Sequence, residues 1–77
     1  MNTVQDTLEY ILQSITQDSQ EVTVENRDEE GVLILEITAP SETVGQIIGR
    51  EGRTIKSIRT LLNIAYPQQR FIVTIKG

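Results

Sequence analysis

The sequence has 77 residues with no cysteine and no histidine, and its eleven acidic and seven basic side chains give a net charge of −4. This length predicts one small domain, 1–77, that is held together by packing alone. The missing residue types exclude a disulfide framework and thiolate metal clusters, and they remove the commonest general base. We therefore expect a binding module rather than an enzyme, without cofactor or metal.

The charges are distributed unevenly along the chain. Residues 1–42 hold ten acidic side chains and one basic one, whereas residues 43–77 hold six basic side chains and one acidic one. The net negative charge opposes indiscriminate binding to polyanions, so any contact with nucleic acid has to be local. The longest apolar run has four residues, and the N-terminus is acidic where a signal peptide is basic. We expect a cytoplasmic protein that does not enter a membrane.

The first half of the chain predicts a helix followed by a β-hairpin. Apolar residues recur at helical spacing over residues 3–17, where Thr3 and Asp6 have the spacing of a capping box. Alternating residues predict strands at about 21–27 and 31–38, joined by a short acidic turn that ends in a glycine. The second strand is apolar on both faces for half its length, so it is predicted to be the central strand.

The second half of the chain predicts two helices and a last strand, which gives the order αββααβ. Ser41 is placed to cap a short helix, and Gly49 is free to take the left-handed conformation that ends it. A longer helix begins at Arg53, and a strand over 71–76 follows it. The apolar sector of this longer helix consists of Ile55, Ile58, Leu61, Leu62 and Ala65, and the opposite sector holds Arg53, Lys56 and Thr60, with Arg59 at its edge.

A Gly-x-x-Gly tetrapeptide, Gly49 to Gly52, lies between these two helices with Arg50 and Glu51 in its middle. Two glycines let the backbone approach a nucleic-acid strand, and the second helix begins there with unpaired N–H groups and a positive dipole end. This element is typical of the phosphate clamp of a KH domain. An ordinary tight turn between two helices is the alternative interpretation.

The order of the elements and the stretch VGQIIGREGRTIKSIRTLL, followed by a proline and a strand, resemble the small bacterial single-KH RNA-binding proteins of the KhpA family. The resemblance covers the whole chain. It implies a type II KH fold of class α+β, with a three-stranded mixed sheet and three helices on one face. It also implies single-stranded RNA as ligand, an RNA chaperone role, and a cytoplasmic bacterial setting. A homodimer, a larger KH-containing partner of the KhpB type, and roles in cell shape and cell wall biogenesis are implied in the same way.

The sequence departs from this family at Glu51, because the family usually has a basic residue at one or both middle positions of the clamp and here the pair is Arg50 and Glu51. A carboxylate about 4 Å from a phosphate repels it by about 1 kcal/mol even in water. The departure concerns the affinity of the clamp and not the fold. It favours the alternative function, a KH-like scaffold for protein interaction or dimerisation with a vestigial clamp.

The clamp predicts a mode of RNA binding in which phosphates meet the backbone N–H groups of residues 50–53 and bases turn toward an aliphatic groove at the sheet edge. The aromatic residues Tyr10, Tyr66 and Phe71 lie outside the motif, so weak, sequence-tolerant binding without base stacking is predicted. Ile48 is expected to be a core residue whose replacement would unfold the domain. The predicted RNA-binding residues are Ile48, Gly49, Arg50, Glu51, Gly52, Arg53, Ile55 and Lys56.

Other sites find less support in the sequence. Arg59 either reaches a phosphate or lies on a solvated helix face. The carboxylates of Glu9, Glu36 and Glu42 are not paired with a nucleophile or base, so no catalytic residues are predicted. The loop also lacks the glycine spacing and the Lys-Ser/Thr pair of a nucleotide-binding P-loop.

Overall fold

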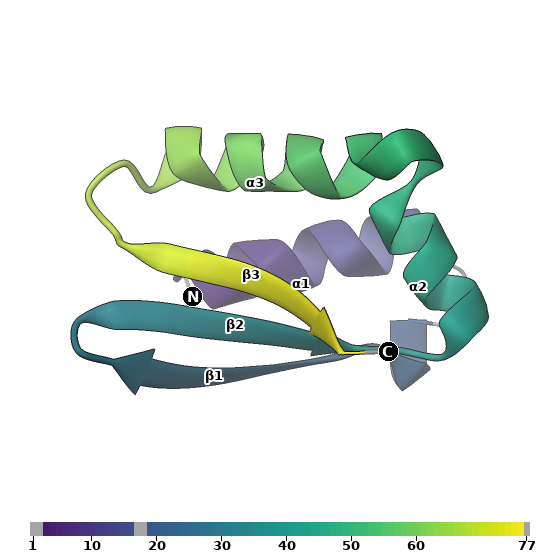
Figure 1. The fold of residues 1–77 in the computed structure, drawn as a ribbon, viewed down its shortest axis with the longest axis horizontal. Helices are drawn as coiled ribbons and strands as arrows, with labels where there is room; N and C mark the ends of the chain where they lie inside the picture. Colours follow the sequence, from purple (N-terminus) through teal and green to yellow (C-terminus); the bar gives the residue numbers. More distant parts are fainter. Residues whose placement is uncertain (1–2, 17–18, 77) are drawn as a thin grey trace.

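Three helices cover one face of a three-stranded sheet (Figure 1). The structure is a computed structural model that describes residues 3–16 and 19–76. The element order αββααβ and the mixed sheet confirm the predicted type II KH-like fold. The elements are α1 (Val4–Ile15), a short 3-10 helix η1 (Ser19–Glu21), β1 (Thr23–Glu29), β2 (Val32–Thr38), α2 (Ser41–Ile48), a second 3-10 helix η2 (Arg50–Gly52), α3 (Arg53–Ala65) and β3 (Phe71–Lys76).

Strand β2 is the central strand, as its two apolar faces predicted. It pairs antiparallel with β1 and parallel with β3, so β3 is an edge strand. The hairpin turn consists of Glu30 and Gly31, whose φ angles of 55° and 86° fit a type I′ turn. Strand β1 begins and ends two residues later than predicted, because its pairing with β2 continues to Glu29 opposite Val32. The tight turn therefore takes up less of the acidic segment than the sequence pattern indicated.

The core lies between the sheet and the helices. Alternate residues of β2 and β3 face the helices, as period-two side-chain direction requires. The apolar sectors of the helices meet them, and burial of each such side chain stabilises the fold by roughly 1.5–3 kcal/mol. The largest fully buried side chains are Leu8, Leu12, Leu35, Ile37, Ile47 and Leu62.

Helix α1 begins with the capping box that the sequence predicted. The Asp6 N–H donates to Thr3 Oγ1 at 3.0 Å, and the Thr3 N–H donates to Asp6 Oδ2 at 3.4 Å. Hydrogen bonding with the side chain and then the backbone of Thr3 lowers the pKa of the Asp6 carboxyl. The helix ends at Ile15, and the predicted end at residue 17 lies outside the described residues.

The predicted cap of α2 is wrong, and only part of the predicted apolar sector of α3 is buried. Pro40 occupies the N-cap position of α2, so Ser41 is the first helical residue and makes no capping bond. In α3 the buried residues are Ile55, Ile58 and Leu62, whereas Leu61 is 55% exposed and Ala65 is exposed. The apolar sector of α3 is therefore wider than the surface that α1 and the sheet cover. No helix of the described chain is long and apolar enough to cross a membrane.

Candidate nucleic-acid interface

Gly49 ends helix α2 in a backbone conformation that only glycine adopts readily. Its N–H donates to the carbonyl of Gly45 at 2.9 Å, and its φ and ψ angles are 78° and 175°. The positive φ agrees with the prediction, although the ψ angle is extended and not left-handed helical. A Cβ atom added at Gly49 would lie 2.2 Å from Thr54 Oγ1, so glycine is also required by space. Glycine therefore lets the backbone at this point pack directly against Thr54.

The next three residues form the tight turn η2. Glu51 and Gly52 both have left-handed backbone angles, with φ values of 56° and 74°. The Gly52 N–H donates to the Gly49 carbonyl at 3.2 Å, and the Arg53 N–H donates to the Arg50 carbonyl. Two of the four N–H groups expected to meet a phosphate are thus used within the loop. No backbone hydrogen bond of the described residues engages the N–H groups of Arg50 and Glu51, so these two are available to an anion.

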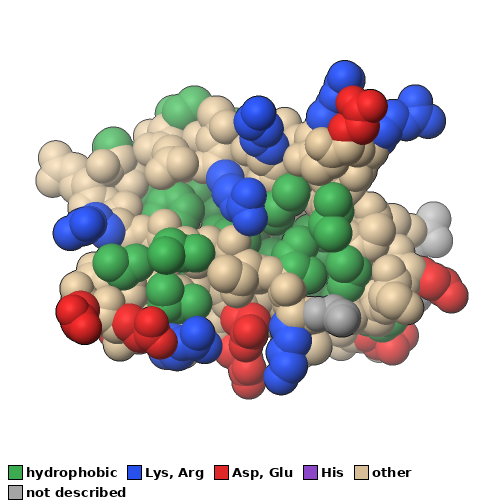
Figure 2. Space-filling view, in the orientation of Figure 1, with side chains coloured by type: hydrophobic (Ala, Val, Ile, Leu, Met, Phe, Trp, Pro, Cys, Tyr) green, Lys and Arg blue, Asp and Glu red, His purple; other side chains and the backbone are tan. Residues whose placement is uncertain are grey.

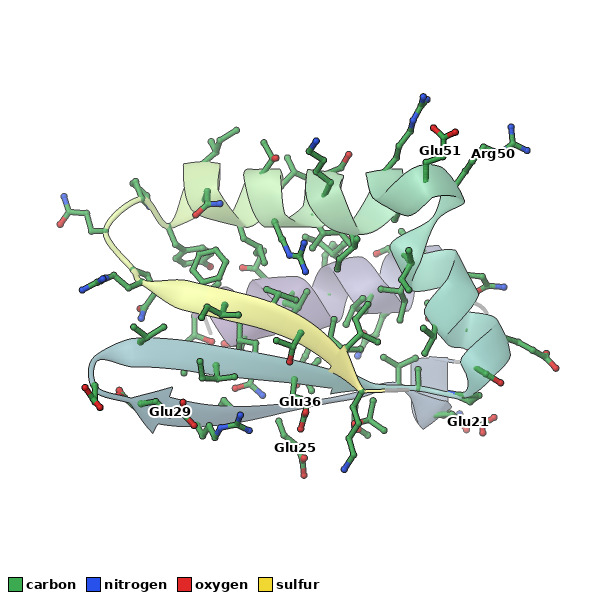
Figure 3. All side chains as sticks on the ribbon, in the orientation of Figure 1. Glu21, Glu25, Glu29, Glu36, Arg50 and Glu51 are labelled. Atoms are coloured by element: carbon green, nitrogen blue, oxygen red, sulfur yellow. The ribbon has the colours of Figure 1, made fainter. Side chains whose placement is uncertain are left out.

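The charged side chains of the loop point away from the body of the domain. Figure 3 shows Arg50 and Glu51 projecting from the junction of α2 and α3. Arg53 Nη2 lies 3.4 Å from Glu51 Oε1, and the two side chains are 79% and 70% exposed. A pair this exposed contributes at most about 1 kcal/mol. The Glu51 carboxylate is therefore partly compensated by Arg53, but either side chain can turn toward a ligand at little cost.

The apolar residues next to the loop divide into core and surface. Ile47 is fully buried and Ile55 is 7% exposed, whereas Ile48 is 37% exposed. The expectation that Ile48 belongs to the core is therefore wrong, because the helical turn that buries Ile47 leaves its neighbour at the side of α2. Lys56 is exposed one turn into α3. Ile48 thus supplies an apolar surface close to the basic loop.

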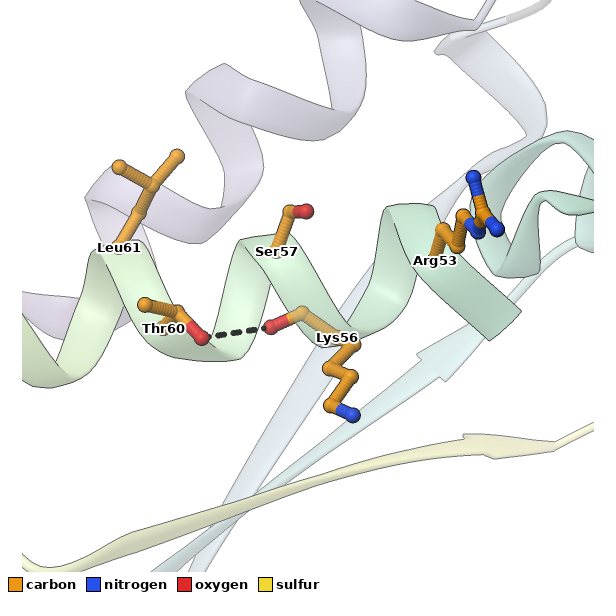
Figure 4. A pocket seen from close by; sticks show the side chains of 5 residues that line it. All are labelled: Arg53, Lys56, Ser57, Thr60 and Leu61. Carbon is orange, nitrogen blue, oxygen red and sulfur yellow. Dashed lines mark hydrogen bonds between the residues drawn. The ribbon is translucent and has the colours of Figure 1, made fainter. Parts of the chain in front are cut away.

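A shallow hollow runs along the outer side of α3 and is about 550 Å³ in volume (Figure 4). All of its lining residues come from this one helix, and Thr60 Oγ1 donates to the Lys56 carbonyl at 3.0 Å within it. Walls from a single helix cannot surround a ligand. The hollow therefore extends the basic surface of the loop and does not form an enclosed site.

A second hollow, about 230 Å³ in volume, lies between α3 and β3. Arg59 Nη2 donates to the Val73 carbonyl at 3.0 Å and so connects the helix to the edge strand. The sequence predicted either a phosphate contact or a solvated position for Arg59, and it carries no signal for a contact between residues 14 apart. Phe71, which the sequence placed outside the motif, also borders this hollow. Its lining residues are Arg59, Asn63, Phe71, Ile72 and Val73.

Acidic and basic side chains are unevenly distributed over the domain. Figure 3 shows Glu25 and Glu36 on the sheet, at the opposite side from Arg50 and Glu51, and these two glutamates are directly paired across β1 and β2. Figure 2 shows basic side chains along the helical side with an acidic one among them, hydrophobic side chains between the layers, and acidic side chains toward the sheet with basic ones beside them. The local field at the loop is therefore more positive than the net charge indicates. In the described part of the chain, no three metal-binding side chains gather into a site.

Comparisons with known proteins agree with this geometry. The family described as KhpA/KhpB, KH domain, matches residues 5–76. The RNA-binding protein KhpA of Thermotoga maritima is 50% identical over 56 residues, which cover 73% of this chain and 75% of that protein. The RNA-binding protein KhpA of Chlamydia caviae is 41% identical over 59 residues, or 77% and 76% of the two chains. No solved structure matches the chain. With residues 5–76 matched and relatives this similar, the chain belongs to the KhpA/KhpB family of KH domains.

Proposed function

We propose that this protein binds single-stranded RNA through the Gly49–Gly52 loop and the groove beside it. The observation that carries the proposal is the loop geometry, in which the N–H groups of Arg50 and Glu51 take part in no backbone hydrogen bond of the described residues and the same loop region carries the guanidinium groups of Arg50 and Arg53. Phosphates would be bound there, because backbone N–H groups and guanidinium ions are the donors that phosphates accept. The names of the relatives, which are RNA-binding proteins, support the same ligand.

The bases would turn toward the groove between α3 and β3. Ile48, the last residue of α2 before the loop, offers an exposed apolar side chain, and Ile55 in the first turn of α3 is almost buried. Duplex RNA keeps its bases stacked and cannot insert them here. The proposal therefore restricts the ligand to single strands, of which a KH loop holds about four nucleotides.

The affinity should be modest. Three side chains can reach phosphates, namely Arg50, Arg53 and Lys56, and Glu51 opposes them. Few contacts and a repelling carboxylate suit a weak binder of low specificity, an RNA chaperone in the cytoplasm that acts with a KH partner. A second RNA site on such a partner would raise the affinity through effective concentration.

The test is a fluorescence anisotropy titration with a short labelled single-stranded RNA at several salt concentrations. With three phosphate contacts, log affinity should fall against log salt with a slope of about −2, since single strands give ~0.7 per contact. An RNA duplex of the same composition should compete poorly. A slope near zero, or equal competition by the duplex, would contradict the proposal.

A second function, self-association or docking of a larger KH-containing protein of the KhpB type, is favoured by the exposed apolar residues of α3. Leu61 and Ile64 are 55% and 71% exposed. Neither side chain contributes to the buried core, so exposure of both is explained if another protein covers them. Light scattering should then show a mass above that of the monomer for the parent protein, and Ile64→Glu should lower it. A monomeric parent would contradict self-association and leave a different protein as the partner.

A further inference from the structure

Arg59 extends from α3 across the groove to the edge strand of the sheet. Its Nη2 atom donates to the Val73 carbonyl at 3.0 Å in a partly buried position. The Arg70 carbonyl accepts a bond from Leu33 on β2, and strand residues alternate between the two sides of a parallel ladder. The carbonyl of Val73 therefore faces the open edge of β3. Arg59 is directed at the floor of the groove and not at the loop, where phosphates would lie.

The hollow around this contact combines groups that recognise a nucleobase. Asn63 stands one turn after Arg59 on α3, and Phe71 and Ile72 line the hollow from β3. Its volume of about 230 Å³ suits one planar ring system and not a larger ligand. Bases in single strands stack on aromatic rings and on guanidinium planes, and both kinds of surface are present here. The hollow thus has the composition of a site for a single base.

The position of the hollow fits a strand that is held at the loop. Arg59 follows Gly52 by seven residues, which places it about 10 Å further along α3 at ~1.5 Å per residue. A KH loop holds about four nucleotides, so the strand reaches this far. A phosphate bound at the loop would therefore bring a neighbouring base, and not a further phosphate, over the hollow.

Hydrogen-bonding chemistry selects among the four bases. The guanidinium group has five N–H donors, of which Val73 takes one. Guanine presents O6 and N7 as adjacent acceptors that match two of the remaining donors, whereas adenine places an N–H₂ donor beside its N7. The opposite edge of guanine carries the N1–H and N2–H₂ donors, and the Asn63 side-chain oxygen can accept a hydrogen bond from them. A purine also covers more of Phe71 than a pyrimidine does.

We propose that this hollow is a guanine-binding subsite and that Arg59 is the residue that reads the base. The proposal rests on the RNA binding proposed above and deepens it, because the loop would hold any strand whereas Arg59 would set a preference. Arg59 then differs in role from Lys56, which would contact phosphate and weaken all sequences equally when it is removed.

The experiment uses uridine octamers that carry one guanosine at each position in turn. For at least one position, guanosine should tighten binding to the parent protein about tenfold relative to the all-uridine octamer, as a bidentate base contact does. Adenosine, cytidine or 7-deazaguanosine at that position should give no such gain, because none of them offers the paired O6 and N7 acceptors. Replacing an atom of the RNA leaves the protein unchanged, so this arm does not depend on a variant that folds.

Arg59→Lys supplies the second arm, because lysine keeps the charge but lacks the planar fork of donors. It should abolish the preference for guanosine, so that the guanosine-containing octamer and the all-uridine octamer bind this variant with the same affinity. Lys56→Gln is the matched control, which should weaken both octamers by the same factor and keep the preference. A parent protein that binds all octamers equally, an equal gain with adenosine, cytidine or 7-deazaguanosine, or a preference that persists in Arg59→Lys would overturn the guanine subsite while leaving RNA binding intact. A parent that binds none of the octamers would overturn RNA binding, and the subsite with it.

Discussion

Gly49 and Thr54 are in such close contact that the loop has no room for a side chain between them. A Cβ atom at Gly49 would lie 2.6 Å from Thr54 Cβ and 2.9 Å from its backbone nitrogen, distances that packed atoms do not reach. At Gly52, by contrast, nothing lies within 4 Å of an added Cβ atom. The two glycines of the motif are therefore required for different reasons, the first by space and conformation and the second by conformation alone.

Alanine substitutions should separate these two requirements. Gly49→Ala should lower the free energy of unfolding by about 2 kcal/mol or more, because strain of ~1–3 kcal/mol from its φ and ψ adds to the clash with Thr54. Gly52→Ala should cost only ~1–2 kcal/mol, the penalty for a left-handed residue. Urea unfolding followed by circular dichroism measures both values. Equal destabilisation by the two substitutions would show that the clash with Thr54 adds nothing to the loss of unfolding free energy in Gly49→Ala.

Ile47 and Ile48 should respond differently to the same substitution. Ile47→Asn should destabilise the domain by about 2 kcal/mol or more, because it buries an amide without hydrogen-bond partners in place of a fully buried side chain. Ile48→Asn should leave a folded domain, since this side chain is 37% exposed, yet it should weaken RNA binding. Thermal unfolding and anisotropy titration distinguish the two effects. If Ile48→Asn unfolds the domain at ordinary temperature, Ile48 is a core residue after all and this account of its exposure is wrong.

Replacing Glu51 with lysine should strengthen RNA binding. The change removes a carboxylate from the loop and frees Arg53 from its ion pair, so affinity should rise about fivefold, or roughly 1 kcal/mol. Stability should change little, because the pair is exposed and the left-handed conformation of Glu51 is equally strained for lysine. Glu51→Gln is the control that removes the charge alone and should give a smaller gain. An unchanged affinity in both variants would mean that residue 51 points away from the bound strand.

The capping box should give the domain a component of stability that depends on pH. The pKa of Asp6 is lowered in the folded state by its bonds with Thr3, so its contribution is present above the unfolded pKa near 4 and is lost as the pH falls through the lower folded value. Asp6→Asn should therefore be less stable than the parent at pH 7, and the difference should shrink below about pH 4. Thermal unfolding from pH 7 to pH 3 measures this. A difference that stays constant over that range would show that the charge of Asp6 does not matter.

The sequence predicted the order of elements because each element carries its own local pattern. The capping-box spacing of Thr3 and Asp6 predicts where α1 begins. The two apolar faces of β2 predict that it is the central strand. The pattern could not show which apolar side chains are buried, because burial depends on contacts between elements. Ile47 and Ile48 are equally apolar neighbours, and only the packing of α2 decides which one is buried. Leu61 falls in the apolar sector of α3 but lies outside the surface that the core covers.

The candidate site divides in the same way. The loop could be located from its glycines, because their conformation is a local property of the chain. The use of two loop N–H groups inside η2, and the contact of Arg59 with Val73, arise only once the backbone has folded. A contact between a side chain and a carbonyl on a distant strand produces no periodic pattern in the sequence, so it cannot be predicted from one.

The most direct test of the RNA clamp is the double substitution Arg50→Asp with Glu51→Asp. It keeps both glycines and the groove, and it places two short carboxylates beside the N–H groups that would bind a phosphate. The fold should persist, because exposed loop substitutions shift stability by about 0.5 kcal/mol or less, and circular dichroism checks this. Binding of a short single-stranded RNA, measured by anisotropy at constant salt, should fall at least tenfold, the equivalent of ~1.4 kcal/mol. A folded double variant that binds this RNA as tightly as the parent would contradict the clamp and leave the scaffold function in its place.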